Sequence, residues 1–342
     1  MLLDFNNLEI NNLHPETDFE KKAIIFLKEW FSESKTVKVQ TSGSTGTPKI
    51  IEIEKEKMLN SAKMTCDFLD LKKGDTALVC LPIEYISGKM MVVRAITRKL
   101  KLIISAPSLK PLENLNESID FCAMTPLQVE NSLHKIHFIK NLIIGGAAVS
   151  ESLKSKILQA LQHSHSPTQI YETYGMSETL SHIALKKTYP IQDQYFNVFD
   201  DIKISTDERN CLKIYAPQLN SEILQTNDLV EIKNTNQFRF LGRIDNVINS
   251  GGAKIFPEQL EALVKKKIAN EVVFLGVKDG SLGQKLILVI EGFASENLKS
   301  QISNLKFEKS FHKPKEIIFV EEIPRTPNGK VNRLELKSIF DI

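Results

Sequence analysis

Cysteine is scarce in this sequence, and the few that occur lie far apart along the chain. They are Cys66, Cys80, Cys122 and Cys211, and no two of them form a CxxC pair. This spacing provides neither the usual ligand pattern of a structural zinc site nor the dense framework of a small disulfide-stapled domain. We therefore expect reduced thiols in the protein core.

Long apolar runs and an excess of one charge are also missing. No stretch approaches the roughly 18 apolar residues that a membrane-spanning helix needs. The first nine residues carry acidic side chains where a signal peptide would have a basic patch and an apolar run. The formal net charge of +2 offers no concentrated basic face for nucleic acid. We expect a cytoplasmic protein that spans no membrane and binds no nucleic acid.

Short apolar segments do occur, and they alternate with helical patterns over the first two thirds of the chain. Several have the composition of strands buried on both faces: residues 76–81, 101–106, 119–124 and 142–144. After Ser150, a candidate N-cap, Leu153, Ile157 and Leu161 recur at every fourth position, which predicts a helix. Such alternation predicts an α/β fold with a mainly parallel sheet covered by helices.

The character of the sequence changes near Leu241. A helix is predicted to begin at Pro257, and a second, polar helix follows two apolar strands. The strands predicted in this part of the chain are residues 272–277, 285–290 and 316–320. Together these elements predict a small α+β unit behind the α/β part.

The segment TSGSTGTPK is the most informative part of the chain. Its glycines let successive backbone N–H groups turn toward one anion, its hydroxyls add donors, and its lysine adds a compact positive charge. The flanking residues 37–40 and 50–53 alternate as strands do, which favours a phosphate-binding hairpin over a flexible linker. Only two residues separate the glycines, so this is not a Walker A loop. The candidate phosphate-binding residues are Thr41, Ser42, Gly43, Ser44, Thr45, Gly46 and Lys49.

This loop resembles the phosphate loop of the adenylate-forming superfamily, which includes acyl-CoA synthetases, luciferases and the adenylation domains of nonribosomal peptide synthetases. Four further segments occur in the order typical of that superfamily. The resemblance implies a large α/β adenylation domain over residues 1–243, which binds ATP and a carboxylic acid. It implies a small mobile α+β domain over residues 244–342, which carries a catalytic lysine. It also implies that ATP, Mg²⁺ and coenzyme A take part in the reaction.

Two of these segments concern the nucleotide. In YGMSET, the resemblance implies that Tyr174 packs on adenine, that Ser177 contacts phosphate and that Glu178 coordinates Mg²⁺. The residue types suit these roles, because an aromatic ring can stack on a purine and a carboxylate can hold a hard cation. Upstream, a predicted strand ends in small residues that would let a flat base approach the backbone: Gly145, Gly146 and Ala147. Considered alone, both segments could equally be ordinary turns.

Charged residues and glycines of the last third complete the nucleotide and thiol sites that the resemblance implies. Asp228 would accept hydrogen bonds from both ribose hydroxyls, with Arg243 as a donor beside it. Asp245 would be the hinge between the domains, and the glycines Gly251 and Gly252 would leave space for the pantetheine arm of coenzyme A. Without the resemblance, Asp228 and Arg243 could each be a surface charge.

The last segment, PRTPNGK, ends in Lys330 near the carboxyl end of the chain. A lysine on such a turn normally faces solvent. The resemblance instead implies that Lys330 enters the active site and bridges the substrate carboxylate and the α-phosphate of ATP. A fixed cation would lower the barrier there, because the transition state brings two anions together.

A narrower resemblance concerns the acid. The segments LPIEYISGKMMVVR, MTPLQV, GGAAV and INSGGAKIFPEQLE are similar to those of the o-succinylbenzoate–CoA ligases of menaquinone biosynthesis, in their short bacterial form. Their substrate has two carboxylates, of which one is activated and the other must be held. Arg94 is the first candidate to hold it and Lys89 the second, while Tyr85 is expected to pack against the substrate. Alternatively, Arg94 is a charge on the helix surface.

Two other functions remain open at this point. One is an aryl- or fatty-acid–CoA ligase with the same chemistry, and the other is a non-catalytic protein that binds an acyl-adenylate as a sensor. Only 40 residues precede the phosphate loop, so the resemblance implies a shortened amino-terminal subdomain. The sequence leaves the oligomeric state open, a homodimer included.

Overall fold

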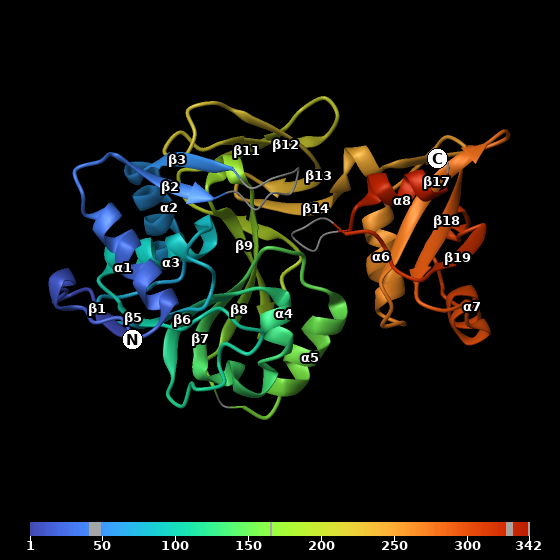
Figure 1. The fold of residues 1–342 in the computed structure, drawn as a ribbon. Helices are drawn as coiled ribbons and strands as arrows, with labels where there is room; N and C mark the ends of the chain where they lie inside the picture. The colour runs from blue at the N-terminus through green and yellow to red at the C-terminus, as the bar shows by residue number, and fades with distance from the viewer. Residues whose placement is uncertain (41–48, 165, 326–330, 341–342) are drawn as a thin grey trace.

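One long mixed sheet organises the first 243 residues (Figure 1). The computed structural model describes residues 1–40, 49–164, 166–325 and 331–340, and within them this sheet has the order β1-β5-β4-β6-β7-β8-β9-β10-β14-β13-β12-β11. The strands are β1 (Leu2–Asp4), β4 (Thr76–Val79), β5 (Lys101–Ile104), β6 (Ile119–Met124), β7 (Ile139–Ile144), β8 (Gln169–Gly175), β9 (His182–Tyr189), β10 (Phe196–Val198), β11 (Lys203–Thr206), β12 (Cys211–Tyr215), β13 (Leu224–Asn234) and β14 (Gln237–Arg243).

The half of the sheet from β5 to β8 is parallel. Successive residues of β4 face opposite sides, because Ala77 and Val79 belong to one hydrophobic cluster and Leu78 belongs to another. Burial on both faces explains why β4 is apolar from Ala77 to Val79. The predicted α/β class is confirmed, and so are the strands predicted within residues 76–144.

From β9 to β11 the neighbouring strands are antiparallel, so the expectation of mainly parallel sheets holds for only one half of this sheet. The reason lies in the connections. β13 ends at Asn234 and β14 begins at Gln237, and a link of two residues cannot contain the crossover that a parallel pair needs. A hairpin is the only arrangement left for such strands.

Helices cover both faces of the parallel half (Figure 1). One face is covered by α1 (Asp18–Trp30), α2 (Lys55–Phe68) and α3 (Ile86–Arg98), and the other by α4 (Pro126–Glu130) and α5 (Glu151–Leu161). Ser150 caps α5, because its side chain accepts a hydrogen bond from the backbone N–H of Leu153 at 3.1 Å. Leu153, Ile157 and Leu161 are buried on its inner face, as their spacing predicts.

The predicted hairpin around the glycine-rich segment is present. β2 (Thr36–Gln40) and β3 (Ile50–Glu54) are antiparallel, and Gln40 pairs with Ile50. The backbone N–H of Gln40 donates to the carbonyl of Glu84 at 3.0 Å, and an isolated bridge joins Gln40 to Tyr85. Gln40, at the end of β2, is therefore held beside the N-terminus of α3.

A second sheet forms the C-terminal part of the fold, at the right in Figure 1. Its strands are β15 (Ile248–Ser250), β16 (Ala253–Ile255), β17 (Val272–Asp279), β18 (Gly283–Glu291) and β19 (Glu316–Val320), and its helices are α6 (Pro257–Lys265), α7 (Glu296–Ser303) and α8 (Arg333–Ile339). Short 3₁₀ turns occur at η1 (Ile10–Asn12), η2 (Leu133–Phe138), η3 (Ser177–Thr179), η4 (Ile244–Asn246) and η5 (Ser310–His312). The helix predicted to begin at Pro257 and the three predicted strands are confirmed.

Helix α6 connects this smaller sheet to the rest of the molecule. The side-chain amide of Gln259 donates to the carbonyl of Leu241 on β14 at 3.2 Å. Beyond the end of α6, Lys266 Nζ lies 3.9 Å from a carboxylate oxygen of Glu151 on α5. Both contacts are polar and exposed, so separating the two parts here would uncover little apolar surface.

A buried ion pair holds α8 against the smaller sheet. Arg333 donates from Nη2 to both carboxylate oxygens of Glu261, at 2.7 and 2.5 Å, and from Nη1 to the carbonyl of Phe274 at 3.1 Å. The backbone N–H of Phe274 donates to Glu261 at 2.7 Å. Glu261 is 7% exposed, so α6, β17 and α8 meet at one desolvated carboxylate.

The four cysteines are free thiols, and all are buried, as the sequence predicts. Cys80 directly follows β4 and Cys122 lies on the neighbouring β6, with their sulfur atoms 3.9 Å apart. Among the described residues, no helix is both long and apolar enough to cross a lipid bilayer.

Candidate active site

Three predicted nucleotide-binding residues meet in the antiparallel half of the large sheet. Tyr174 near the end of β8 donates its hydroxyl proton to Asp228 Oδ2 at 2.6 Å. Arg243 lies directly across from Asp228 in the β13–β14 pairing, and its Nη1 donates to Asp228 Oδ1 at 3.3 Å. Resemblance and structure therefore agree in bringing these residues together.

The bond between Tyr174 and Asp228 also reveals the shape of the sheet. Strands β9, β10 and β14 lie between β8 and β13, and four steps across a flat sheet would cover about 19 Å. The sheet must curl strongly for the two side chains to touch. Phe196 and Phe238 fill the inside of the curl, with ring centroids 5.7 and 4.9 Å from that of Tyr174.

The cluster is charged on one side and apolar on the other. Burial and the carboxylate of Asp228 raise the pKa of Tyr174, so its hydroxyl stays protonated and acts as a donor. Arg243 also donates to Asp245 Oδ2 at 2.8 Å, and the amide of Asn227 donates to the same carboxylate at 3.1 and 3.2 Å. Asp245, the predicted hinge residue, lies in η4 and is thus bonded to the cluster of Tyr174, Asp228 and Arg243.

Ser177 and Glu178 lie on η3, immediately after Tyr174, and both are exposed. The turn before them requires glycine, because a Cβ atom at Gly175 would be 2.3 Å from the carbonyl oxygen of Ser181. An exposed carboxylate on a fixed turn is a suitable ligand for a hard cation such as Mg²⁺.

The predicted base-facing segment follows β7, next to β8. The N–H of Gly145 donates to the carbonyl of Met124 at 3.1 Å, and a Cβ atom here would be 2.8 Å from the hydroxyl oxygen of Thr173. Gly146 has a φ of +85°, a conformation that glycine adopts readily. Gly146 and Ala147 are exposed, so backbone is accessible beside the strand that carries Tyr174.

The predicted acid-binding residues lie on α3, whose N-cap residue is Tyr85. Arg94 is only 2% exposed, so the alternative of a helix-surface charge is wrong. Its Nη2 donates to Ser181 Oγ at 2.9 Å, and its Nε has no hydrogen-bond partner in the part of the chain that the structure describes. Burial lowers the pKa of Arg94 to about 10, and among the described residues no carboxylate lies within ion-pair distance of it.

Lys89 leaves the same helix in another direction. Its Nζ lies 4.2 Å from the ring centroid of Phe26 and 3.9 Å from a carboxylate oxygen of Glu29, both on α1. Burial lowers the pKa of Lys89. The structure therefore does not bring Lys89 and Arg94 together, and only Lys89 already has a carboxylate near it.

Three side chains next to Arg94 are not singled out by sequence analysis. Ser181 receives its hydrogen bond, His182 lies beside Ser181, and Thr65 on α2 contacts His182. The only sequence signal is that Ser181 and His182 closely follow YGMSET. Thr65 is 117 positions away from His182, and no local pattern connects them.

The remaining candidates divide into described and undescribed residues. Gly251 and Gly252 form the exposed turn between β15 and β16, with φ values of +56° and +80°. Lys49 is exposed and directly precedes β3. The predicted phosphate-binding residues from Thr41 to Gly46 and the predicted catalytic Lys330 lie outside the described residues.

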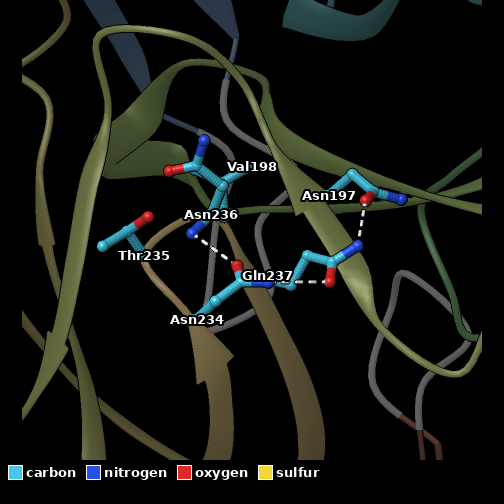
Figure 2. Close-up of a pocket in the computed structure, with 6 residues that line it drawn as sticks. All are labelled: Asn197, Val198, Asn234, Thr235, Asn236 and Gln237. Atoms are coloured by element: carbon cyan, nitrogen blue, oxygen red, sulfur yellow. Dashed lines mark hydrogen bonds between the residues drawn. The ribbon is translucent and has the colours of Figure 1, made fainter.

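Two hollows lie away from these side chains. One of about 450 Å³ is shown in Figure 2, and its amide groups bond one another, as in the 2.7 Å bond from Gln237 to Asn197. The other, of about 490 Å³, lies between β13–β14 and the β15–β16 hairpin. Its apolar lining comes from both sides of η4: Leu229, Val230, Leu241, Ile244, Val247 and Phe256. The joint between the two sheets is therefore incompletely packed.

Comparison with known proteins places this arrangement in a family. Residues 33–203, half of the chain, match the family described as AMP-binding enzyme. Among curated proteins, the 2-succinylbenzoate–CoA ligase of Lactococcus lactis is 24% identical over 328 residues, which cover 89% of this chain and 71% of that protein.

Solved structures agree with this assignment. The acyl-CoA synthetase (AMP-forming)/AMP-acid ligase II-like protein of Dyadobacter fermentans is 34% identical, with a TM-score of 0.65, over 96% of this chain and 97% of that one. The o-succinylbenzoate coenzyme A synthetase of Bacillus subtilis, solved with ATP and a magnesium ion, has a TM-score of 0.71 at 18% identity, over 88% of this chain and 69% of that one, which establishes the fold alone. The chain belongs to the AMP-binding enzyme family.

Proposed function

We propose that this protein is an AMP-forming ligase that joins a carboxylic acid to coenzyme A, and that the acid is o-succinylbenzoate. The observation that carries the choice of acid is the buried guanidinium of Arg94. It faces Ser181, close behind the nucleotide segment, and no described carboxylate neutralises it. A buried charge without a partner is costly, and the second carboxylate of a dicarboxylic substrate would offset that cost.

The nucleotide part of the proposal rests on the cluster around Asp228. Asp228 would accept from the ribose hydroxyls, and Arg243 and Tyr174 would hold the carboxylate in place through the bonds of 3.3 and 2.6 Å. The ring of Tyr174 would pack on adenine, beside Gly145, Gly146 and Ala147. Ser177 would contact phosphate. When bound, Mg²⁺ offsets phosphate charge, and Glu178 is the carboxylate that would hold it.

We infer that Arg94 rather than Lys89 binds the second carboxylate of the acid. Lys89 is already near Glu29, so a substrate anion would have to compete with that side chain. The planar guanidinium of Arg94 can bind a carboxylate with two parallel hydrogen bonds, which favours an acid with a fixed second carboxylate. Tyr85, at the N-terminus of the same helix, would pack against the substrate.

The proposed reaction has two steps in one site. A carboxylate oxygen of the acid attacks the α-phosphorus of ATP, and pyrophosphate leaves as the acyl-adenylate forms. The sulfur of coenzyme A then attacks the acyl carbonyl, and AMP leaves as the thioester forms. Residues 1–243 would bind ATP and acid, and residues 244–342 would turn about Asp245, withdrawing Lys330 and presenting Gly251 and Gly252 beside the pantetheine arm.

A panel of acids tests this function. The protein is incubated with ATP, Mg²⁺ and each acid, and pyrophosphate and thioester are measured with and without coenzyme A. We expect turnover with o-succinylbenzoate and little with benzoate or a fatty acid. Turnover of the monocarboxylates with none of o-succinylbenzoate would instead favour a general aryl- or fatty-acid–CoA ligase. Calorimetric binding of ATP without turnover of any acid would favour an adenylate sensor.

The Tyr174→Phe variant tests the nucleotide cluster. It keeps the ring but removes the hydroxyl that bonds Asp228, and losing a hydrogen bond to a charged group costs about 1.5–3 kcal/mol. We expect the Kd for ATP, measured by calorimetry, to rise roughly tenfold or more. Tyr195→Phe is the matched control, because Tyr195 donates to Glu231 at 2.5 Å outside this cluster. An equal effect of both substitutions would contradict the assignment.

A further inference from the structure

A chain of hydrogen bonds runs inward from Arg94. Arg94 Nη2 donates to Ser181 Oγ at 2.9 Å, and Ser181 Oγ lies 3.2 Å from His182 Nδ1. On the other side of the imidazole, His182 Nε2 lies 3.1 Å from Thr65 Oγ1. Thr65 Oγ1 donates in turn to the backbone carbonyl of Ser61 at 3.2 Å.

The chain is desolvated along most of its length. Thr65 is 0% exposed, Arg94 2% and His182 7%, so water cannot substitute for a missing partner. Each hydroxyl here has one proton to donate and lone pairs to accept with. Once the proton of one hydroxyl is assigned, the donor and the acceptor of each other bond in the chain follow.

The Thr65 end fixes the tautomer of the imidazole. Thr65 Oγ1 lies 3.2 Å from the carbonyl of Ser61, and we assign its proton to that bond, so that toward His182 it accepts. With this assignment His182 carries its proton on Nε2, and Nδ1 is a bare acceptor. A second proton on the ring is disfavoured, because burial and the charge of Arg94 place the pKa of His182 well below its ordinary value.

The bare nitrogen in turn orients Ser181. With Nδ1 unprotonated, the hydroxyl of Ser181 donates its proton to His182 Nδ1. The oxygen of the same hydroxyl accepts from Arg94. Within the described parts of the chain, Arg94 Nε has no hydrogen-bond partner, and the contact of Nη1 is with the sulfur of Met91, at 3.7 Å. A carboxylate oxygen is a stronger acceptor than a thioether sulfur, and either nitrogen could donate to one.

We propose that His182, as the neutral Nε2–H tautomer, is a positioning residue that holds Arg94 through Ser181 and thereby sets the preference of the enzyme for a dicarboxylic acid. The proposal rests on the proposed function, because it assumes that Arg94 receives the second carboxylate. It assigns roles to residues outside the acid site itself. Thr65 on α2 determines which imidazole nitrogen of His182 is protonated, and His182, at the start of β9, thereby orients the hydroxyl of Ser181.

The tautomer can be measured without any substrate. Nitrogen-15 NMR of the full-length protein distinguishes the protonated from the bare imidazole nitrogen, and the signals of His182 are those that disappear in His182→Asn. We expect Nε2 to be protonated and Nδ1 bare at neutral pH. In Thr65→Val, which removes the acceptor at nearly constant shape, we expect a mixture of tautomers. A ring protonated on Nδ1, or on both nitrogens, in the unsubstituted protein would overturn the proposal.

Steady-state kinetics test the positioning role. In His182→Leu we expect the KM for o-succinylbenzoate to rise about tenfold, with kcat and the KM for ATP nearly unchanged. His182→Asn, whose amide can replace Nδ1 as the acceptor for Ser181, should recover most of the loss. Thr65→Val is a milder change and should raise the KM for o-succinylbenzoate by a smaller factor, again with kcat and the KM for ATP nearly unchanged. An unchanged KM for the acid in His182→Leu, or an equal rise in both KM values, would contradict a positioning role.

The proposed function and the role of His182 can be rejected independently of each other. If the unsubstituted protein does not use o-succinylbenzoate, the proposed function is wrong, and the NMR measurement still decides the tautomer. If it does use that acid and the variants leave its KM unchanged, the proposed function stands and the role of His182 is rejected.

Discussion

Replacing Lys330 by alanine is expected to slow acyl-adenylate formation by about 10²–10³-fold and to leave thioester formation from preformed adenylate nearly unchanged. The first step brings the carboxylate of the acid toward the phosphates of ATP, and a fixed cation lowers that barrier by stabilising the charge as the anions meet. In the second step the β- and γ-phosphates have left as pyrophosphate, and the acid carboxylate is already bonded to the α-phosphate, so the cation no longer has two anions to bring together.

Lys330 lies outside the described residues, but the chain on both sides of its segment is anchored. Arg325 and Val331 form an isolated antiparallel bridge, and the N–H of Asn332 donates to the carbonyl of Pro324 at 2.7 Å. Arg333 then enters the buried pair with Glu261. The described residues on either side of the proposed catalytic cation are therefore bonded to each other, and through Arg333 to α6 and β17 of the smaller unit.

The two half-reactions are measured separately for Lys330→Ala. Pyrophosphate exchange with ATP reports the first, and release of AMP from synthetic acyl-adenylate and coenzyme A reports the second. Lys337→Ala, on α8 of the same unit, is the control and should change neither rate. Equal losses in both half-reactions of Lys330→Ala would contradict the proposed role.

The largest effect on stability is expected from Glu261→Ala. Removing one member of a buried ion pair commonly costs about 3–5 kcal/mol, because the other charge remains desolvated and unpaired. Here Arg333 would lose two hydrogen bonds, and the backbone N–H of Phe274 would lose its acceptor. Three elements that meet at this carboxylate, α6, β17 and α8, would be loosened together.

Denaturation followed by two signals can locate this effect. The single tryptophan, Trp30, lies on α1 of the larger part, while far-UV circular dichroism reports both parts. We expect the dichroism transition of Glu261→Ala to begin at lower denaturant, with less change in the fluorescence transition of Trp30. Glu296→Ala is the control, because its pair with Lys299 has a carboxylate side chain that is 88% exposed and is worth about 0.2–1 kcal/mol. Comparable effects of the two substitutions would show that the Glu261 pair contributes little.

The fold class and the parallel strands could be predicted because strands that are buried on both faces contain recognisable apolar runs. In β6, residues Phe121 to Met124 form a buried apolar run, and Ser150 followed by regularly spaced leucine and isoleucine marks a helix start. The antiparallel half carries a weaker mark. Strands such as β13 and β14 mix buried and exposed residues, with irregular register between them, so their pairing is decided by tertiary contacts.

The candidate site shows the same division. Asp228 and Arg243 are found by their order along the chain, and the cross-strand pairing explains why that order works. The burial of Arg94 could not be predicted, because α3 has apolar residues on most of its surface and the helix pattern does not say which polar residue faces inward. His182 and Thr65 become partners only when β9 packs against α2, and sequence separation hides that contact.

The first turn of α3 limits how the range of acids could change through evolution or design. A Cβ atom at Gly88 would be 2.2 Å from the carbonyl oxygen of Pro82, so the helix is seated at the closest possible approach to the preceding turn. The bridge from Gln40 to Tyr85 ties that turn to the glycine-rich hairpin as well. If the proposed function is correct, new acids would therefore have to be accommodated by exchanging side chains around Arg94, since shifting the helix would disturb the β2–β3 hairpin at the same time.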